Sequence, residues 1–292
     1  MIEQSSIIIM ILSVAFAVVV PAGLCFYLTF SGKTTWRNIL VGMAGYFVAE
    51  LLLRSQVLGL LERSPAFAEI YSVPIYNGLI GGFTYAFFGA AVCYLAGFVL
   101  LKRPFDMKCA LGMGVGIGSL HVIGTLGINS LMSLIVATNY NNGTLSSVAE
   151  TLGTGYVAGI LERFSAVTRL ELVIDVFQYL AGIVPMIAVA VLLVYGLRAR
   201  KHSFIFSAMA VWFFFEVFRI FLGYVSPWFS LLWVLFFGML AWIFCELVKD
   251  IYKNTPEASY APKTVRKKGN EKKDVSVVGD RRDKKKKKKK KK

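Results

Sequence analysis

The chain has 292 residues, of which 57% are hydrophobic and only 17% are charged, and its mean hydropathy is +0.64. This composition excludes an ordinary water-soluble domain and indicates a membrane protein. The formal net charge of +15 arises at one end, because the last 44 residues hold 19 of the 32 Lys and Arg but only 6 of the 17 Asp and Glu. Four cysteines without C-x-x-C spacing predict neither a disulfide framework nor a thiolate metal site.

Seven apolar stretches are long enough to cross a bilayer, whose core of about 30 Å needs roughly 20 residues of helix. They are residues 7–30, 39–61, 73–101, 109–137, 172–197, 203–222 and 228–248. The sequence therefore predicts an all-α transmembrane bundle over residues 1–248, with about seven spans. Residues 139–147 (NYNNGTLSS) have the composition of a loop. From Tyr156 onward the pattern is helical, so either the fifth span begins early or an eighth helix on the membrane surface precedes it.

The distribution of basic residues predicts the orientation, since Lys and Arg in short connections stay on the cytoplasmic side. The second, fourth and sixth connections carry only Arg63, Arg163 and Arg169. The first, third and fifth carry more: Lys33, Arg37, Lys102, Arg103, Lys108, Arg198, Arg200 and Lys201. We expect a multi-pass protein of the plasma membrane with its N-terminus outside and its C-terminus inside.

Residues 249–292 form a basic tail that ends in nine lysines and contains Pro256 and Pro262. Its charge repulsion and lack of apolar surface predict disorder. Beside an anionic inner leaflet, each Lys or Arg gains about 1 kcal/mol, so anionic lipids are its expected partners. No aromatic platform accompanies the lysines, and specific binding of nucleic acid is therefore not expected.

Ionisable groups within the predicted spans are candidates for function, because charges are costly in lipid. Glu50 and Arg54 lie four residues apart in the second span, and Glu216 and Arg219 lie three apart in the sixth. Each pair can neutralise itself on one helical face and serve only to orient helices. His121, halfway along the fourth span, can hydrogen-bond a neighbouring helix or act as an acid or base in a cavity.

Four glycines precede His121 in the segment LGMGVGIGSLH, and they form two overlapping G-x-x-x-G spacings. They are Gly112, Gly114, Gly116 and Gly118. Such spacings let neighbouring helix backbones approach closely, so we expect the fourth span to be central. The alternative is that these glycines clear space beside His121 for the backbone of a substrate.

Several chemistries lack the residues they need. The chain has two histidines and no H-E-x-x-H, which excludes the usual imidazole-rich zinc site. Asp175 alone cannot form the carboxylate pair of an aspartyl protease. Phosphate-binding glycine loops are also absent. We therefore expect no metal and no cofactor.

Most of residues 1–248 resembles the YhfC family of glutamate-type intramembrane peptidases, which are distantly similar to CAAX-processing and bacteriocin-processing membrane proteases. Five segments show the resemblance, in order along the chain: VVVPAGLCFYLTF, YFVAELLLRSQVLGLL, GLIGGF, GMGVGIG and ILERFSAV. The resemblance implies that a Glu activates water to attack a peptide bond within the membrane, with help from Arg and His on other helices.

The chain departs from that family at the positions that would perform hydrolysis. A Glu-Glu pair followed by Arg is replaced by Thr84, Tyr85 and Phe88, and the fourth span has Ile117 and His121 in place of a His and a Glu. Three further positions fit the pattern in part, as weak catalytic candidates beside His121: Glu162 and Arg163 are retained, and Glu216 follows Trp212 where a carboxylate follows a His.

Because one positioned base supplies about 10² to 10⁴ in rate, we infer a retained fold whose hydrolytic chemistry is lost. Its intramembrane cavity would then bind a membrane peptide, a lipid or a partner helix, and we expect the family's motif positions to line it, namely Thr84, Tyr85, Phe88, Ile117 and His121. Two alternatives stay open. One is an active peptidase with a rearranged site that uses His121 with Glu162 or Glu216. The other is a small transporter or the membrane subunit of one, suggested by glycine-bearing spans with buried Glu and Arg.

Overall fold

The computed structural model describes residues 2–102 and 104–254, without side chains for residues 165 and 166. The predicted polylysine tail, from residue 255 onward, lies outside the described residues. In these two ranges every regular element is a helix, so the predicted all-α class is confirmed. The elements up to residue 141 are α1 (Gln4–Phe30), α2 (Trp36–Tyr46), η1 (Phe47–Arg54), α3 (Ser55–Leu61), α4 (Pro65–Ser72), α5 (Pro74–Leu100), α6 (Met107–Val122), η2 (Ile123–Gly127) and α7 (Ile128–Asn141).

The second half of the described chain contains six helices, of which the first is the shortest and the last the longest. These are α8 (Leu145–Leu152), α9 (Thr154–Ala166), α10 (Arg169–Ala181), α11 (Ile183–Ala199), α12 (Ser203–Val225) and α13 (Pro227–Asn254). Seven helical rods in the described residues have the length and hydropathy of membrane spans, which confirms the predicted number. Three of them are compound, namely α2–η1–α3, α6–η2–α7 and α10–α11.

Most predicted span boundaries differ from the structure by one to six residues. Helix α13 continues to Asn254, six residues beyond the predicted end of the bundle at residue 248. The predicted loop over 139–147 is reduced to residues 142–144, because α7 continues to Asn141 and α8 begins at Leu145. Gly143 has a positive φ of 73°, which favours glycine and ends α7 there. The helical pattern from Tyr156 onward belongs to α9, a short helix before the fifth span.

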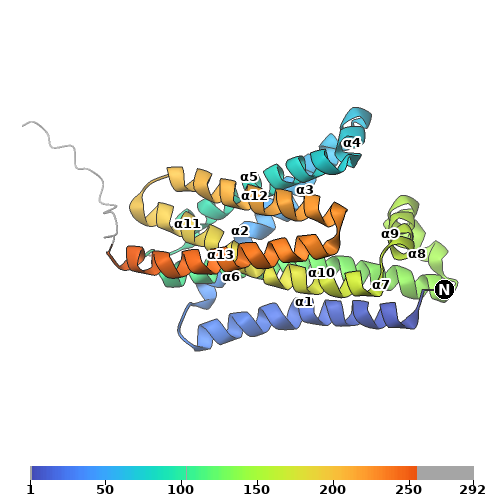
Figure 1. Ribbon diagram of the computed structural model, residues 1–292, viewed down its shortest axis with the longest axis horizontal. Coiled ribbons are helices and arrows are strands. Elements are labelled where there is room, and N and C mark those ends of the chain that lie inside the picture. The colour runs from blue at the N-terminus through green and yellow to red at the C-terminus, as the bar shows by residue number, and fades with distance from the viewer. Residues whose placement is uncertain (1, 103, 255–292) are drawn as a thin grey trace, which may run out of the picture. The chain divides into compact units, whose positions relative to one another are not determined.

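Figure 1 shows the long helices running side by side. Helices α8 and α9 lie at the same end as the start of α1, and the α1–α2 and α11–α12 connections lie at the opposite end. Large apolar side chains face outward along the spans; Val99 is 72% exposed and Phe206 is 71% exposed. Such surfaces suit lipid and not water. The structure therefore describes a membrane-embedded bundle, and its predicted orientation stays a prediction.

Helix α6 packs against α2 through two glycines on one face. A Cβ atom at Gly112 would collide with Oγ1 of Thr34, and one at Gly116 would collide with the backbone carbonyl of Ile39. A side chain can rotate away from such a contact, but a helix backbone cannot. The closest approach between these two helices therefore requires glycine at position 116.

The other two glycines of α6 face α11. A Cβ atom at Gly114 would lie 2.5 Å from Cα of Ile187, and one at Gly118 would lie 2.9 Å from Cα of Ile183. The four alternating glycines thus place α6 between α2 and α11, with backbone contact on both sides. His121 follows one turn later, at the end of the most tightly packed part of the bundle.

Candidate functional site

Polar side chains from five helical rods meet at the middle of the bundle, and we call this group the polar centre. Its members are Tyr46, Glu50, Arg54, Thr84, Tyr85, His121, Tyr179, Trp212, Glu216 and Arg219. Most of them lie near the middle of their spans. Charged groups at this depth need partners, because lipid supplies none.

The first half of the centre is built on η1, a π-helical segment of the second span. Arg54 forms an ion pair with Glu50 one turn earlier on the same segment. Its Nε also donates to Oγ1 of Thr84 at 3.0 Å, and its guanidinium lies 3.6 Å from the ring centre of Tyr85. Thr84 and Tyr85 occupy positions where the chain departs from the family's motif. Thr84 holds Arg54 by a hydrogen bond, and Tyr85 holds it by a cation–π contact.

His121 lies in the last turn of the glycine-rich helix α6, two residues before the second π-helical segment, η2. Its Nδ1 shares a hydrogen bond of 2.7 Å with the hydroxyl of Tyr46. The rings of Tyr85 and Tyr179 lie 6.2 and 6.1 Å from the imidazole ring, centre to centre. Only 3% of His121 is exposed. Three tyrosines from three different helices thus enclose one imidazole.

The second ion pair of the centre lies on α12. Both Nε and Nη2 of Arg219 donate to Oε2 of Glu216, at 2.8 and 2.7 Å, and the guanidinium lies 5.6 Å from the ring centre of Tyr179. The other carboxylate oxygen, Oε1, is buried and has no hydrogen-bond partner among the described residues. The indole Nε1 of Trp212, one turn earlier, is also buried and has no hydrogen-bond partner among the described residues.

The two ion pairs form one electrostatic cluster, because all four of their charges act on the phenol of Tyr85. The charges of Arg54, Glu216 and Arg219 also act on His121. Two acids and two bases leave the cluster formally neutral. Neutral pairing is the arrangement that burial demands, since an unpaired charge here would cost several kcal/mol.

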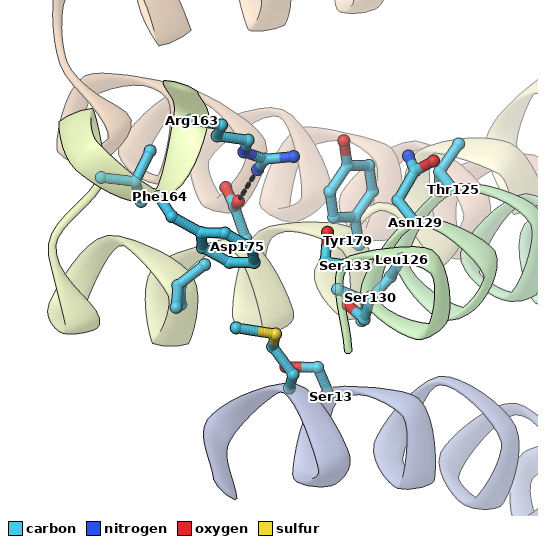
Figure 2. Close-up of a pocket in the computed structure, with 13 residues that line it drawn as sticks. Ser13, Thr125, Leu126, Asn129, Ser130, Ser133, Arg163, Phe164, Asp175 and Tyr179 are labelled. Atoms are coloured by element: carbon cyan, nitrogen blue, oxygen red, sulfur yellow. Dashed lines mark hydrogen bonds and ion pairs between the residues drawn. The ribbon is translucent and has the colours of Figure 1, made fainter. Parts of the chain in front are cut away.

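A separate hollow lies beside the polar centre, and we call it the α9 crevice (Figure 2). Helices α1, α7, α9 and α10 and the segment η2 line it, and it encloses a cavity of about 40 Å³. Its polar lining residues are Ser13, Thr125, Asn129, Ser130, Ser133, Arg163, Asp175 and Tyr179, and its apolar ones are Met10, Leu126, Phe164, Val167 and Leu172.

The α9 crevice has a charged pair at α9 and a link to the polar centre at its inner end. Nη2 of Arg163 donates to Oδ2 of Asp175 at 2.9 Å, joining α9 to α10 (Figure 2). Tyr179 lines the crevice and also contacts His121. Thr125 lines it and donates to the backbone carbonyl of His121 at 2.5 Å. The crevice thus ends one side chain away from the imidazole.

The structure places the sequence-derived candidates in three groups. Glu50, Arg54, Thr84, Tyr85, His121, Glu216 and Arg219 lie together in the polar centre. Ile117 is fully buried one turn before His121, and half-buried Phe88 packs its ring against Phe87. Arg163 lines the α9 crevice, and Glu162 lies on the exposed face of α9.

Sequence reasoning did not single out Tyr46 or Tyr179. A usable signal was present for each, because both lie one helical turn from an ionisable residue: Tyr46 before Glu50, and Tyr179 after Asp175. Side chains four residues apart share a helical face. A tyrosine on the face of a membrane-embedded charge is therefore a candidate partner for that charge.

These features define an integral membrane protein with seven span-length helices in its described part, a neutral ionic cluster at mid-depth and a polar crevice beside it. The model of the family described as YhfC intramembrane metalloprotease matches residues 16–236. This match covers well over half of the sequence, and the chain belongs to that family.

One relative is the uncharacterized membrane protein YhfC of Bacillus subtilis (strain 168). It is 23% identical over 210 residues, which cover 70% of this chain and 80% of the relative. No solved structure matches the chain. The comparisons thus confirm the resemblance found in the sequence. The family description names a metal-dependent protease, whereas the resemblance implied water activation by a glutamate.

The residues that the structure describes do not suit a catalytic metal ion. Such a site needs about three His, Cys or carboxylate ligands around one point, and no group of three comes together among the described residues. The polar centre offers one imidazole and two carboxylates, but Arg54 and Arg219 already bind the carboxylates. A divalent cation there would also be repelled by both guanidinium groups.

Proposed function

We propose that this chain is a YhfC-family membrane protein that no longer hydrolyses peptide bonds and that binds a peptide segment of another membrane protein. One observation supports the loss of hydrolysis above all: each carboxylate of the polar centre is held by an arginine of its own helix. A general base must be able to take a proton from water within hydrogen-bond reach. Glu50 and Glu216 are instead committed to Arg54 and Arg219.

The substituted family positions support the same conclusion. Thr84 accepts a hydrogen bond from Arg54, and Tyr85 lies under its guanidinium, so both side chains stabilise a buried cation. Neither a threonine hydroxyl nor a phenol replaces a carboxylate base at neutral pH. His121 shares its Nδ1 with Tyr46 inside a packed group of rings. The chemistry at these positions therefore suits packing and not hydrolysis.

The α9 crevice supports the binding part of the proposal. It combines apolar walls with hydroxyl and amide groups, and it lies between helices α1, α7, α9 and α10. A peptide within a membrane must satisfy its backbone N–H and C=O groups locally wherever it is not helical. Asn129, Ser130 and Ser133 offer such hydrogen bonds on neighbouring turns of one helix. A lipid headgroup is the competing occupant.

Photocrosslinking tests the binding proposal. A benzophenone side chain in place of Ser133 is expected to give a discrete protein adduct in intact membranes. The same group in place of Leu131 on the lipid-facing side of α7, which is 40% exposed, is the matched control. Adducts with lipid alone at position 133, or equal protein adducts at both positions, would contradict peptide binding.

A second candidate function is an active peptidase with a rearranged site, and one observation favours it. Oε1 of Glu216 has no hydrogen-bond partner among the described residues and lies in the same cluster as His121. Incubation of the purified protein with transmembrane peptides separates the two candidates. We expect no cleavage. Cleavage that disappears in His121→Ala, Glu216→Gln or Glu162→Gln would establish the peptidase and refute the loss of hydrolysis.

A further inference from the structure

The α9 crevice is lined by hydrogen-bonding groups without a hydrogen-bond partner among the described residues. Within the described part of the chain, the side chains of Asn129, Ser133 and Tyr179 make no hydrogen bond to a protein group, although each lines the crevice. Unpaired polar groups in apolar surroundings cost free energy. About 10–15 Å³ is enough to hold one water molecule, and the cavity measures about 40 Å³. The cavity is therefore large enough to hold bound water that would satisfy these groups.

Helix α9 covers the crevice with little packing of its own. Of its described side chains only Val157 is buried, and Cβ atoms added at Gly155 or Gly159 would meet nothing within 4 Å. Further hollows lie along α9: one is lined by Tyr156 and Ile160, and another by Leu161 and Phe164. A helix held by so few contacts can move as a unit.

Residues with non-helical backbone conformations lie at both ends of α9. Gly153 precedes the helix with φ at 93°, a conformation that L side chains rarely adopt. After the helix, Val167 and Thr168 are extended, and the side chain of Thr168 caps α10. Between these ends, the ion pair from Arg163 to Asp175 joins α9 to the wall of the crevice.

We propose that the α9 crevice is a water-binding entrance to the polar centre, that Tyr179 closes its inner end, and that the Arg163–Asp175 ion pair holds α9 over it. The entrance admits water and small hydrogen-bonding solutes to one wall of the His121 pocket. This assignment describes the crevice when no membrane peptide occupies it, and it does not depend on the proposed peptide binding.

Chemical modification of the two histidines tests the role of Tyr179. Diethyl pyrocarbonate carbethoxylates accessible imidazoles, and mass spectrometry of the digest reports each site separately. In the chain without substitutions we expect His121 to react at least tenfold more slowly than the exposed His202. Tyr179→Ala should raise the rate at His121 at least tenfold, whereas Tyr179→Phe keeps the ring and should leave it unchanged. Equal rates at His121 in all three proteins would refute closure by Tyr179.

Thiol accessibility tests for water in the crevice independently of that result, and it decides the question if Tyr179→Ala does not fold. In a chain whose four native cysteines are alanines, Ser133→Cys is compared with Leu131→Cys on the lipid-facing side of α7. A small cationic methanethiosulfonate is added to both sides of the membrane. Because it reacts with the hydrated thiolate, position 133 should react at least tenfold faster. Equal rates would refute the water-filled entrance.

The ion pair is tested at the deeper position Ser13→Cys, on the α1 wall of the crevice. Arg163→Ala and Asp175→Asn should each raise its reaction rate about threefold or more, and the charge-exchanged double variant should restore the original rate. Lys249→Ala removes an exposed ion pair elsewhere and should change nothing. Unchanged rates in both single variants would show that the pair does not hold α9 closed.

Discussion

The glycine-packed helix α6 and the loosely packed helix α9 show opposite uses of small residues within one bundle. At Gly112 and Gly116 a Cβ atom would strike a neighbouring helix, whereas at Gly155 and Gly159 it would meet open space. The first pair lets α6 lie close against the segment that contains Thr34 and Ile39, with backbone contact at Gly116. The second leaves α9 with little contact to the rest of the bundle. The most constrained part of the protein thus adjoins one of its least constrained parts.

The same contrast holds for the charged groups. In the polar centre the four side chains of the two ion pairs are at most 15% exposed, and the side chain of Glu216 is fully inaccessible. In the α9 crevice the side chain of Arg163 is 50% exposed and that of Asp175 is 25% exposed. The positions that correspond to the family's catalytic motif therefore lie in the closed region, and the accessible polar groups of the crevice lie on the other side of Tyr179.

Breaking a buried ion pair is expected to have the largest effect. Arg219→Met would leave the buried carboxylate of Glu216 without its partner, and unpaired buried charges destabilise proteins by about 3–5 kcal/mol. We expect this loss in the free energy of unfolding, measured by denaturant titration in detergent micelles. The double variant Glu216→Gln with Arg219→Met removes both charges and should recover most of the stability. Equal stability of the single variant and the parent would show that the pair is not buried in the membrane-embedded protein.

The sequence predicted the spans and both ion pairs well, because each depends on local spacing. About twenty apolar residues define a span, and four residues place Glu50 beside Arg54. The meeting of the two pairs around Tyr85 depends instead on how five helical rods pack, which no local pattern specifies. The partner of Asp175, Arg163, likewise comes from another helix. Spacing along α10 could not reveal it.

A comparison of two glycine substitutions should have the next largest effect and tests the packing contrast directly. Gly116→Ala places a methyl group against the backbone carbonyl of Ile39, and such overpacking costs about 1–3 kcal/mol. Gly159→Ala meets open space in α9, where alanine favours a helix over glycine by up to about 1 kcal/mol. In denaturant titrations, the free energy of unfolding should therefore fall in Gly116→Ala and rise in Gly159→Ala. Similar losses in both variants would show that α9 packs as tightly as α6.

Removal of one hydroxyl from the polar centre should have a smaller effect. Tyr46→Phe leaves Nδ1 of the buried His121 without its hydrogen bond, at a cost of about 1–3 kcal/mol. Tyr94→Phe is the matched control, because Tyr94 makes the corresponding bond of 3.0 Å to the exposed His202, where water can replace the lost hydroxyl. The loss of unfolding free energy should be larger in Tyr46→Phe than in Tyr94→Phe, because water cannot reach the buried imidazole of His121. A larger loss at Tyr94 would contradict the enclosed imidazole.

The smallest effect on stability is expected at the ion pair of the crevice. Arg163→Ala removes a partly exposed pair, and such pairs contribute about 0–1 kcal/mol because water screens them and long side chains lose entropy. The same variant should nevertheless change access to position 13 severalfold. Stability and access can separate in this way only if α9 opens without unfolding the bundle. If Arg163→Ala instead lowers the free energy of unfolding by several kcal/mol, as we expect for Arg219→Met, α9 belongs to the packed core. The contrast between the two regions would then be wrong.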